Sequence, residues 1–171
     1  MLTAIEQTGE SSVRSLGRPG DLGWVVMAHG EVYAQEFGWD SSFEALVARI
    51  VADYAGAHDP AREAAWIAEV GEQRLGCVFC VADPDDETTA LLRILLVHPD
   101  GRGCNLGRRL VGACVEFARE AGYERVRLWT NDPLAAARHL YLERGFRLLA
   151  EAPHHSFGAD LVGQTYELEL A

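Results

Sequence analysis

The residues best suited to chemistry lie in one run, residues 95–110, which reads LLVHPDGRGCNLGRRL. An apolar stretch ends at Pro99, a short loop rich in Gly and Arg follows, and a patterned helix begins near Leu106. A strand, a glycine-rich turn and a helix N-terminus in this order can hold a phosphate group. The first N–H groups of a helix have no intrahelical partner, and the helix dipole adds partial positive charge there. The sequence therefore predicts a site for a phosphate compound.

Two common phosphate loops do not fit this run. A Walker A loop needs Lys and then Ser or Thr after its last glycine, but Gly107 is followed by Arg108 and Arg109, and the chain contains no Lys. A Rossmann loop needs a third glycine where Leu106 stands, and an acidic residue at the end of the next strand. That strand ends in Trp-Thr-Asn at residues 129–131, so no carboxylate is present to hold a ribose.

The pattern that fits is Arg-x-x-Gly-x-Gly, and the segment from Arg102 to Gly107 resembles the acyl-CoA pyrophosphate loop of the GNAT N-acetyltransferases. Asn105 stands where that family usually has Gly. Asn is the residue other than Gly that best tolerates a positive φ, so we expect the loop to form. The alternative from the loop alone is a plain strand-to-helix turn with a glycine-rich cap.

Composition limits the class of protein. The net charge of −11 argues against a nucleic-acid partner, and no apolar run approaches the length of a membrane span. The charge is uneven, because ten of the 15 Arg residues lie between Arg93 and Arg147, where a polyanionic cofactor would bind. At 171 residues we expect one domain, residues 1–171.

The four cysteines are expected to be reduced thiols in a cytoplasmic protein, because the N-terminus lacks the features of a secretory signal. Cys77 and Cys80 have C-x-x-C spacing but fall in an alternating apolar run. On a strand, positions three apart point to opposite faces, so we predict no metal site there.

The elements that must position the loop are predicted from hydrophobic periodicity and turn residues. In the first half we expect a short strand or extended lead-in at 11–18, a helix capped by Asp21 that runs toward Phe37, and a second helix capped by Ser41 or Ser42. A hairpin of strands at 64–70 and 74–82 follows, and then an apolar central strand at 88–97.

In the second half we expect the helix after the loop to end at Gly122, and a strand at 125–130. Asp132 as cap and Pro133 as first helical residue predict another helix that ends at Gly145. Strands at 146–150 and 162–170, joined by a long loop at 151–161, complete the chain.

This element order is similar to the GNAT fold from end to end, which implies an α/β (α+β) fold with a central mixed, mostly antiparallel sheet flanked by helices. The chain most resembles the small GNAT domains that also occur fused to MarR-type regulators. The shared stretches include residues 128–132, 139–141, 145–146 and 154–165. The resemblance implies transfer of an acetyl group from acetyl-CoA to an amine by direct attack in a ternary complex, without a metal.

The resemblance also implies how acetyl-CoA is held. The backbone of Leu95, Leu96 and Val97 would bind the pantetheine arm as an added strand, and the strand at 126–130 would splay away to leave room. The pyrophosphate would lie on the backbone of the loop and first helical turn: Arg102, Gly103, Cys104, Asn105, Leu106, Gly107 and Arg108. The family often has Asn where Leu134 stands, and Asn131 is the candidate to replace that contact.

Amide formation needs a proton acceptor for the amine, donors for the oxyanion and a proton for the departing thiolate. By resemblance, Tyr141 in Tyr-x-x-x-Gly-Phe is the general acid, although it could instead be a core residue. The central strand has no Glu to act as base, so His154, His155 and Glu36 remain candidates. His29 and His139 are read as residues on helix faces.

The acceptor pocket is expected to have Tyr33, Glu36 and Trp39 on one wall and Trp129 on another, which suits an apolar or aromatic small-molecule amine. A homodimer is compatible with this reading. An acyl-CoA-binding regulatory module with little or no catalysis is the alternative, favoured by Asn105, Leu134 and the missing strand carboxylate. Acetylation of protein N-termini is a third reading, without a recognisable peptide groove in the sequence.

Overall fold

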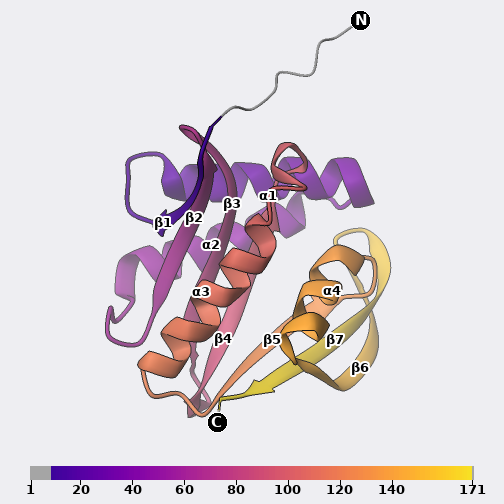
Figure 1. Cartoon of the computed structure of the whole chain (residues 1–171). Coiled ribbons are helices and arrows are strands. Elements are labelled where there is room, and N and C mark those ends of the chain that lie inside the picture. Colours follow the sequence, from indigo (N-terminus) through magenta and orange to yellow (C-terminus); the bar gives the residue numbers. More distant parts are fainter. Residues whose placement is uncertain (1–8, 171) are drawn as a thin grey trace, which may run out of the picture.

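Seven strands and four α-helices make up the part of the chain that the computed structural model describes, residues 9–170 (Figure 1). The strands form one sheet in the order β1-β2-β3-β4-β5-β7-β6. Their bounds are β1 Ser11–Ser15, β2 Ala64–Val70, β3 Gln73–Asp83, β4 Asp86–Val97, β5 Arg125–Asn131, β6 Arg147–Ser156 and β7 Ala159–Glu169. The helices are α1 Asp21–Phe37, α2 Ser41–Ala57, α3 Leu106–Glu120 and α4 Ala135–Arg144, with a 3-10 turn at Pro99–Gly101.

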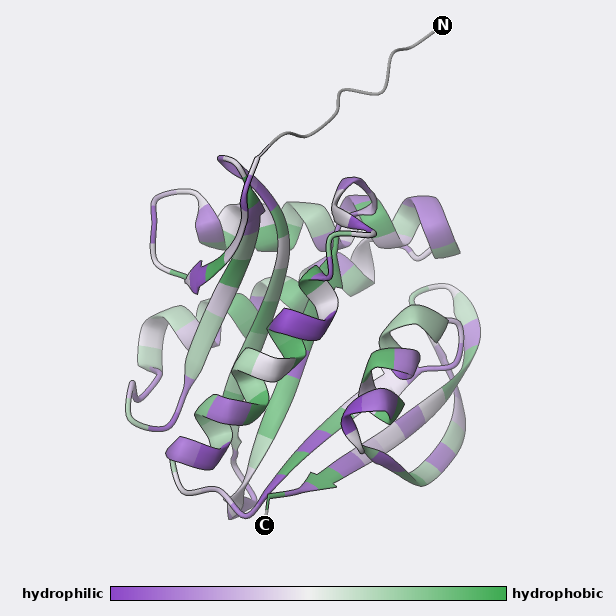
Figure 2. Ribbon diagram, viewed as in Figure 1, coloured by the Kyte–Doolittle hydropathy of each residue, from purple (hydrophilic) through white to green (hydrophobic). Residues whose placement is uncertain are grey.

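The sheet is mixed, because β4 and β5 pair in parallel while the other neighbouring strands in the described part of the chain pair antiparallel. Helices α1 and α2 cover one face of β2 to β4, and α3 covers the other (Figure 1). Strands β3 and β4 are largely hydrophobic along their length, whereas α3 alternates apolar and polar residues (Figure 2). This arrangement confirms the predicted fold class.

Each face of the sheet has its own buried core. Cys77 and Phe79 belong to the core under α1 and α2, and Val78 and Cys80 belong to the core under α3. The two cysteines therefore point to opposite faces, as their spacing predicts. All four cysteines carry free thiols.

Strands β4 and β5 separate after a short pairing, and this opening creates the space for a site. The paired residues run only from Thr89 to Leu91 on β4, opposite 125–127 on β5. Within residues 9–170, β5 pairs with none of the later β4 residues, and the two strands diverge toward the α3 N-terminus (Figure 1). The register with β3 also shifts near Ile94, whose φ of 44° is exceptional for a β-branched residue.

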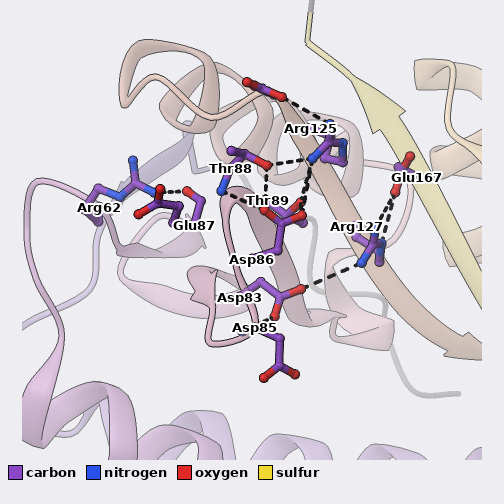
Figure 3. Close-up of polar contacts among 11 residues, drawn as sticks. Arg62, Asp83, Asp85, Asp86, Glu87, Thr88, Thr89, Arg125, Arg127 and Glu167 are labelled. Atoms are coloured by element: carbon purple, nitrogen blue, oxygen red, sulfur yellow. Dashed lines mark hydrogen bonds and ion pairs between the residues drawn. The ribbon is translucent and has the colours of Figure 1, made fainter.

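Polar contacts hold the closed end of this opening together (Figure 3). Arg125 of β5 donates to Thr88 Oγ1 at 2.7 Å and pairs with Asp86 at 3.3 Å. The neighbouring Arg127 bridges Glu167 of β7 at 2.8 Å and Asp83 of β3 at 3.8 Å. Hydrogen bonds from Thr88 and Thr89 lower the pKa of Asp86 to about 2, so this carboxylate stays charged.

The predicted helix caps were wrong at three helix starts. Asp40, not Ser41 or Ser42, is the N-cap of α2, and its carboxylate accepts from the Ser42 N–H. Asp21 is the first residue of α1, where Arg14 and Arg74 contact its carboxylate. Asp132 does not cap α4, which begins at Ala135. The carboxylates of Asp21 and Asp132 have partners outside the helices that they were predicted to cap.

Asp132 instead joins the end of β5 to β7. Its N–H donates to the Val162 carbonyl at 3.0 Å, and its carboxylate accepts from the Val162 N–H at 2.8 Å. The last two strands were also predicted too short, because residues 151–161 form no long loop. Strands β6 and β7 form a continuous hairpin that turns at Phe157 and Gly158.

No helix within residues 9–170 combines the length and the apolar character that a membrane span requires.

Candidate functional site

The first cavity, of about 500 Å³, lies where the glycine-rich loop meets the open end of the β4–β5 gap. Its walls come from the end of α1, the end of β4, the loop with the first turn of α3, and the start of α4. Most of the predicted cofactor residues line it, namely Leu95, Leu96, Val97, Arg102, Gly103, Asn105, Leu106, Gly107 and Arg108. Cys104, Asn131 and Tyr141, which were also predicted to contact the cofactor, do not line this cavity.

The loop adopts the conformation that the sequence predicts. Gly103 has a φ of 84°, and Asn105, the N-cap of α3, has a φ of 60° and a ψ of 21°. The Asn105 side chain accepts a hydrogen bond from Arg108 at 3.2 Å and, within residues 9–170, no side chain caps the first turn of α3. The N–H groups of that turn are therefore available to an anion in the cavity.

Gly107 lies in close contact with α4. A Cβ atom at this position would lie 2.6 Å from Leu140 Cδ1 of α4 and 3.4 Å from Val97 Cγ2 of β4. The missing side chain lets α4 approach the first turn of α3, and this close approach forms one wall of the first cavity.

Arginine side chains surround the loop, and acidic residues balance two of them. Arg102 is ion-paired with Glu36 of α1, and Arg108 pairs with Glu143 of α4 at 2.6 Å. Both arginines are more than half exposed, so a polyanion could compete with the carboxylates for them.

A second cavity, of about 460 Å³, continues from the first through the gap between β4 and β5. Tyr33, Leu95, Leu134 and Ala137 line both cavities, so the two meet there. Six aromatic side chains line the second cavity: Tyr33, Trp39, Phe43, Trp129, Tyr141 and Phe157. The loop between α1 and α2 and the β6–β7 turn close one side, since Phe157 packs on Trp39 and Phe43 with ring centroids about 5 Å apart.

Tyr141 is buried on α4 and lines the second cavity. Its ring neighbours Phe146 and Tyr166, as a core residue would. Burial, with a smaller contribution from Tyr33, raises the pKa of Tyr141 well above its usual value. The hydroxyl is therefore protonated at neutral pH and can donate a hydrogen bond into the cavity.

None of the three predicted base candidates lines the second cavity. His154 is on β6, where its Nε2 contacts Asn131 Oδ1 at 2.7 Å and its Nδ1 contacts Ser156 Oγ at 2.8 Å. His155 is exposed and contacts Asp160 at 2.8 Å. Glu36 lines the first cavity and pairs with Arg102.

The predicted acceptor-pocket residues are brought together, except for Glu36. Tyr33, Trp39 and Trp129 all line the second cavity, and Asn131 joins them at the end of β5. The lining residues that sequence reasoning missed include His29, Phe43, Arg93 and Phe157. His29 could have been predicted from its spacing, because it lies one helical turn before Tyr33 and therefore shares its helix face.

The amino-acid sequence matches one protein family. The family model described as "Acetyltransferase (GNAT) family" matches residues 26–146. An uncharacterized N-acetyltransferase of Schizosaccharomyces pombe is 32% identical over 142 residues, which cover 80% of this chain and 82% of that protein. N-acetyltransferase 8F1 of Rattus norvegicus is 36% identical over 104 residues, which cover 59% of this chain and 45% of the rat protein.

Solved structures share the fold. The spermidine N-acetyltransferase of Vibrio cholerae, solved in complex with CoA and spermine, superposes with a TM-score of 0.71 at 17% identity. The match covers 94% of this chain and 95% of that one. The alignments with the vertebrate relatives, by contrast, span less than half of the length of those proteins.

Proposed function

The chain belongs to the acetyltransferase (GNAT) family, and on this premise we propose that it transfers an acetyl group from acetyl-CoA to the amine of a small-molecule acceptor. We take residues 1–171 as a single domain with this activity. The observation that carries the proposal is the pair of cavities that meet at Tyr33, Leu95, Leu134 and Ala137. One cavity has the features of a site for a phosphate-bearing cofactor, and the other has aromatic walls.

The residues of the first cavity fit acetyl-CoA, which supplies the acetyl group as a thioester when it is bound. The uncapped N-terminus of α3 suits the pyrophosphate, and Arg102 and Arg108 add positive charge beside it. The edge of β4 from Leu95 to Val97, which β5 leaves free in the described structure, suits the amide groups of the pantetheine arm.

Direct transfer within a ternary complex is supported by the continuity of the two cavities. An amine in the second cavity can reach the junction while the first cavity is filled, so no acetylated enzyme is needed. Among the described residues, none of the four cysteines lines either cavity, so a thiol nucleophile is not available at the junction.

Tyr141 is the residue that we assign to protonate the departing sulfur. Its hydroxyl is protonated at neutral pH because burial raises its pKa, and its ring lines the cavity beside the junction residues Leu134 and Ala137. Proton donation by a positioned side chain contributes about 10²- to 10⁴-fold to a rate.

The acceptor is proposed to be an apolar or aromatic amine, since six aromatic side chains line the second cavity. The test is a panel of amines, including amino acids, aromatic amines and spermine, incubated with acetyl-CoA and analysed by mass spectrometry for acetylated products. We expect turnover of aromatic amines with release of free CoA thiol. Tight CoA binding without turnover of any amine would instead support a regulatory acyl-CoA-binding module.

A further inference from the structure

His29 is a buried histidine with one ring nitrogen unsatisfied. It lies on α1 with 1% of its surface exposed, and its Nδ1 lies 2.7 Å from the Val25 carbonyl oxygen. A carbonyl oxygen can only accept, so Nδ1 carries the hydrogen and Nε2 keeps a lone pair. That Nε2 is the single buried side-chain nitrogen or oxygen within residues 9–170 that has no hydrogen-bond partner.

An unsatisfied buried acceptor lowers the stability of a protein, so its presence needs an explanation. The surroundings of His29 are apolar and aromatic. Its ring stacks on Tyr33 with centroids 5.7 Å apart and planes 8° from parallel, and it contacts Phe43 at 6.1 Å. A Phe or Leu side chain would satisfy this packing without leaving a lone pair unpaired.

The unpaired nitrogen of His29 belongs to a side chain that lines the acceptor cavity. His29 lines the second cavity, and its stacking partner Tyr33 lines both cavities at their junction. Two other polar side chains along the cavity are already engaged. Arg127 pairs with Glu167 and Asp83, and Asn131 contacts His154.

We propose that His29 Nε2 accepts a hydrogen bond from the amine of the acceptor, and so holds that nitrogen near the junction of the two cavities. This inference rests on the proposed acetyltransferase function and names the residue that binds the acceptor's reacting group. One N–H of the amine is used in the contact, which leaves the nitrogen lone pair free to attack. Burial also lowers the pKa of His29 to about 4, so the ring is neutral and its acceptor available at neutral pH.

The test compares His29→Phe with His58→Phe. His58 is a matched control, because its Nδ1 also contacts a carbonyl four residues earlier, Tyr54 O at 2.7 Å, and its ring stacks on Tyr54, yet it lines neither cavity. We expect His29→Phe to lower kcat/KM for the amine by roughly ten-fold or more, through KM for the amine, since a bound N–H loses its partner. CoA affinity and the thermal midpoint should not fall, and His58→Phe should keep the wild-type KM.

A conservative variant separates binding from packing. The side-chain oxygen of His29→Gln can accept a hydrogen bond, so this variant should recover part of the activity that His29→Phe loses. If His29→Phe keeps an amine KM within two-fold of wild type, the inference is wrong. The same conclusion follows if His29→Phe and His29→Gln lose activity equally while both remain folded.

A readout without catalysis distinguishes this inference from the proposed function. The ¹⁵N NMR signal of His29 Nε2 in the CoA-loaded wild type should shift when amines of the panel are added. Wild-type protein that acetylates no amine would overturn the proposed function, whatever the variants do. Amine turnover by wild type without any shift of Nε2 would overturn the role of His29 alone.

Discussion

Arg102, at the loop before α3, is ion-paired with Glu36, the last but one residue of α1, and both side chains line the first cavity. The pair therefore links the two sides of the space that we assign to acetyl-CoA. A phosphate group on the loop and the Glu36 carboxylate would compete for the same guanidinium, so Glu36 should weaken cofactor binding.

Replacing Glu36 with Gln should tighten CoA binding by about 1.4- to five-fold, in line with the 0.2–1 kcal/mol typical of partly exposed ion pairs. Isothermal titration calorimetry at low and high salt measures the effect, which should shrink as salt increases. Glu116→Gln is the control, because Glu116 pairs with Arg119 and Arg144 and lines neither cavity. Equal affinity of wild type and Glu36→Gln at low salt would contradict the prediction.

Substitutions of Asn105 test whether the loop depends on the left-handed backbone conformation at this position. Asn105→Gly should keep the wild-type thermal midpoint and CoA affinity, because Gly adopts a φ of 60° without strain. Asn105→Val should destabilise the protein by about 1–2 kcal/mol and weaken CoA binding, because a β-branched residue resists positive φ. Thermal unfolding and calorimetry measure both effects, and a Val variant that behaves like wild type would show that the loop conformation is not needed.

The cofactor half of the site could be predicted from sequence because its signals are local. The apolar run of β4, the glycine-rich loop and the first turn of α3 follow one another in the chain. A resemblance to a family motif over these few consecutive residues is therefore enough to predict how the strand, the loop and the helix lie relative to one another. The acceptor half depends on side chains from distant elements, such as His29 of α1, Phe43 of α2 and Phe157 of the β6–β7 turn. Periodicity indicates that such residues are buried, but not which cavity they share.

The β6–β7 hairpin shows why the last segment was misread as a loop. Pro153 is unfavourable in a central strand, but β6 is an edge strand, where Pro is tolerated. The two-residue turn places Phe157 at a φ of 59°, which is unusual for an aromatic residue. Contacts with Trp39 and a hydrogen bond from the Asp40 N–H to the Phe157 carbonyl hold it there. Local sequence gives no sign of these tertiary contacts.

Tyr141→Phe should lower kcat by about 100-fold while leaving CoA affinity within two-fold of wild type, as expected when a general acid is removed. Steady-state kinetics at saturating acetyl-CoA and calorimetry with CoA provide the two measurements. Tyr166→Phe is the control, since Tyr166 neighbours Tyr141 but lines neither cavity. Since burial raises the pKa of Tyr141, its ionisation should produce no loss of activity up to pH 10. An unchanged kcat in Tyr141→Phe would exclude the assigned role.

The position of Arg93 leads us to expect a preference for amines that carry a carboxylate. Arg93 lines the second cavity, and its guanidinium makes no hydrogen bond or ion pair with any residue from 9 to 170, although Asp53 acts on it through space. An acceptor that carries a carboxylate could pair with this guanidinium. We expect Arg93→Gln to reduce kcat/KM about ten-fold for phenylalanine and little for phenethylamine, which lacks the carboxylate. Equal losses for the two amines would mean that Arg93 does not select a carboxylate.

The buried neutral state of His29 predicts a stability that depends on pH. The pKa of His29 is about 4 in the folded protein and near 6.5 when unfolded, so the unfolded chain binds the extra proton first as pH falls. The free energy of unfolding should therefore decrease by about 3 kcal/mol between pH 7 and pH 4 on account of this residue. Arg14 and its neighbours hold the pKa of Asp21 below its usual range. The stabilisation that this carboxylate provides is therefore lost only below about pH 4, outside the range in which His29 titrates. Tyr33, stacked on His29, has a raised pKa and stays neutral throughout.

Urea unfolding of wild type and His29→Phe at intervals between pH 7 and pH 4 measures the contribution of His29 to the free energy of unfolding, since the variant should lack this contribution. Parallel curves for the two proteins would show that His29 is not a buried neutral acceptor.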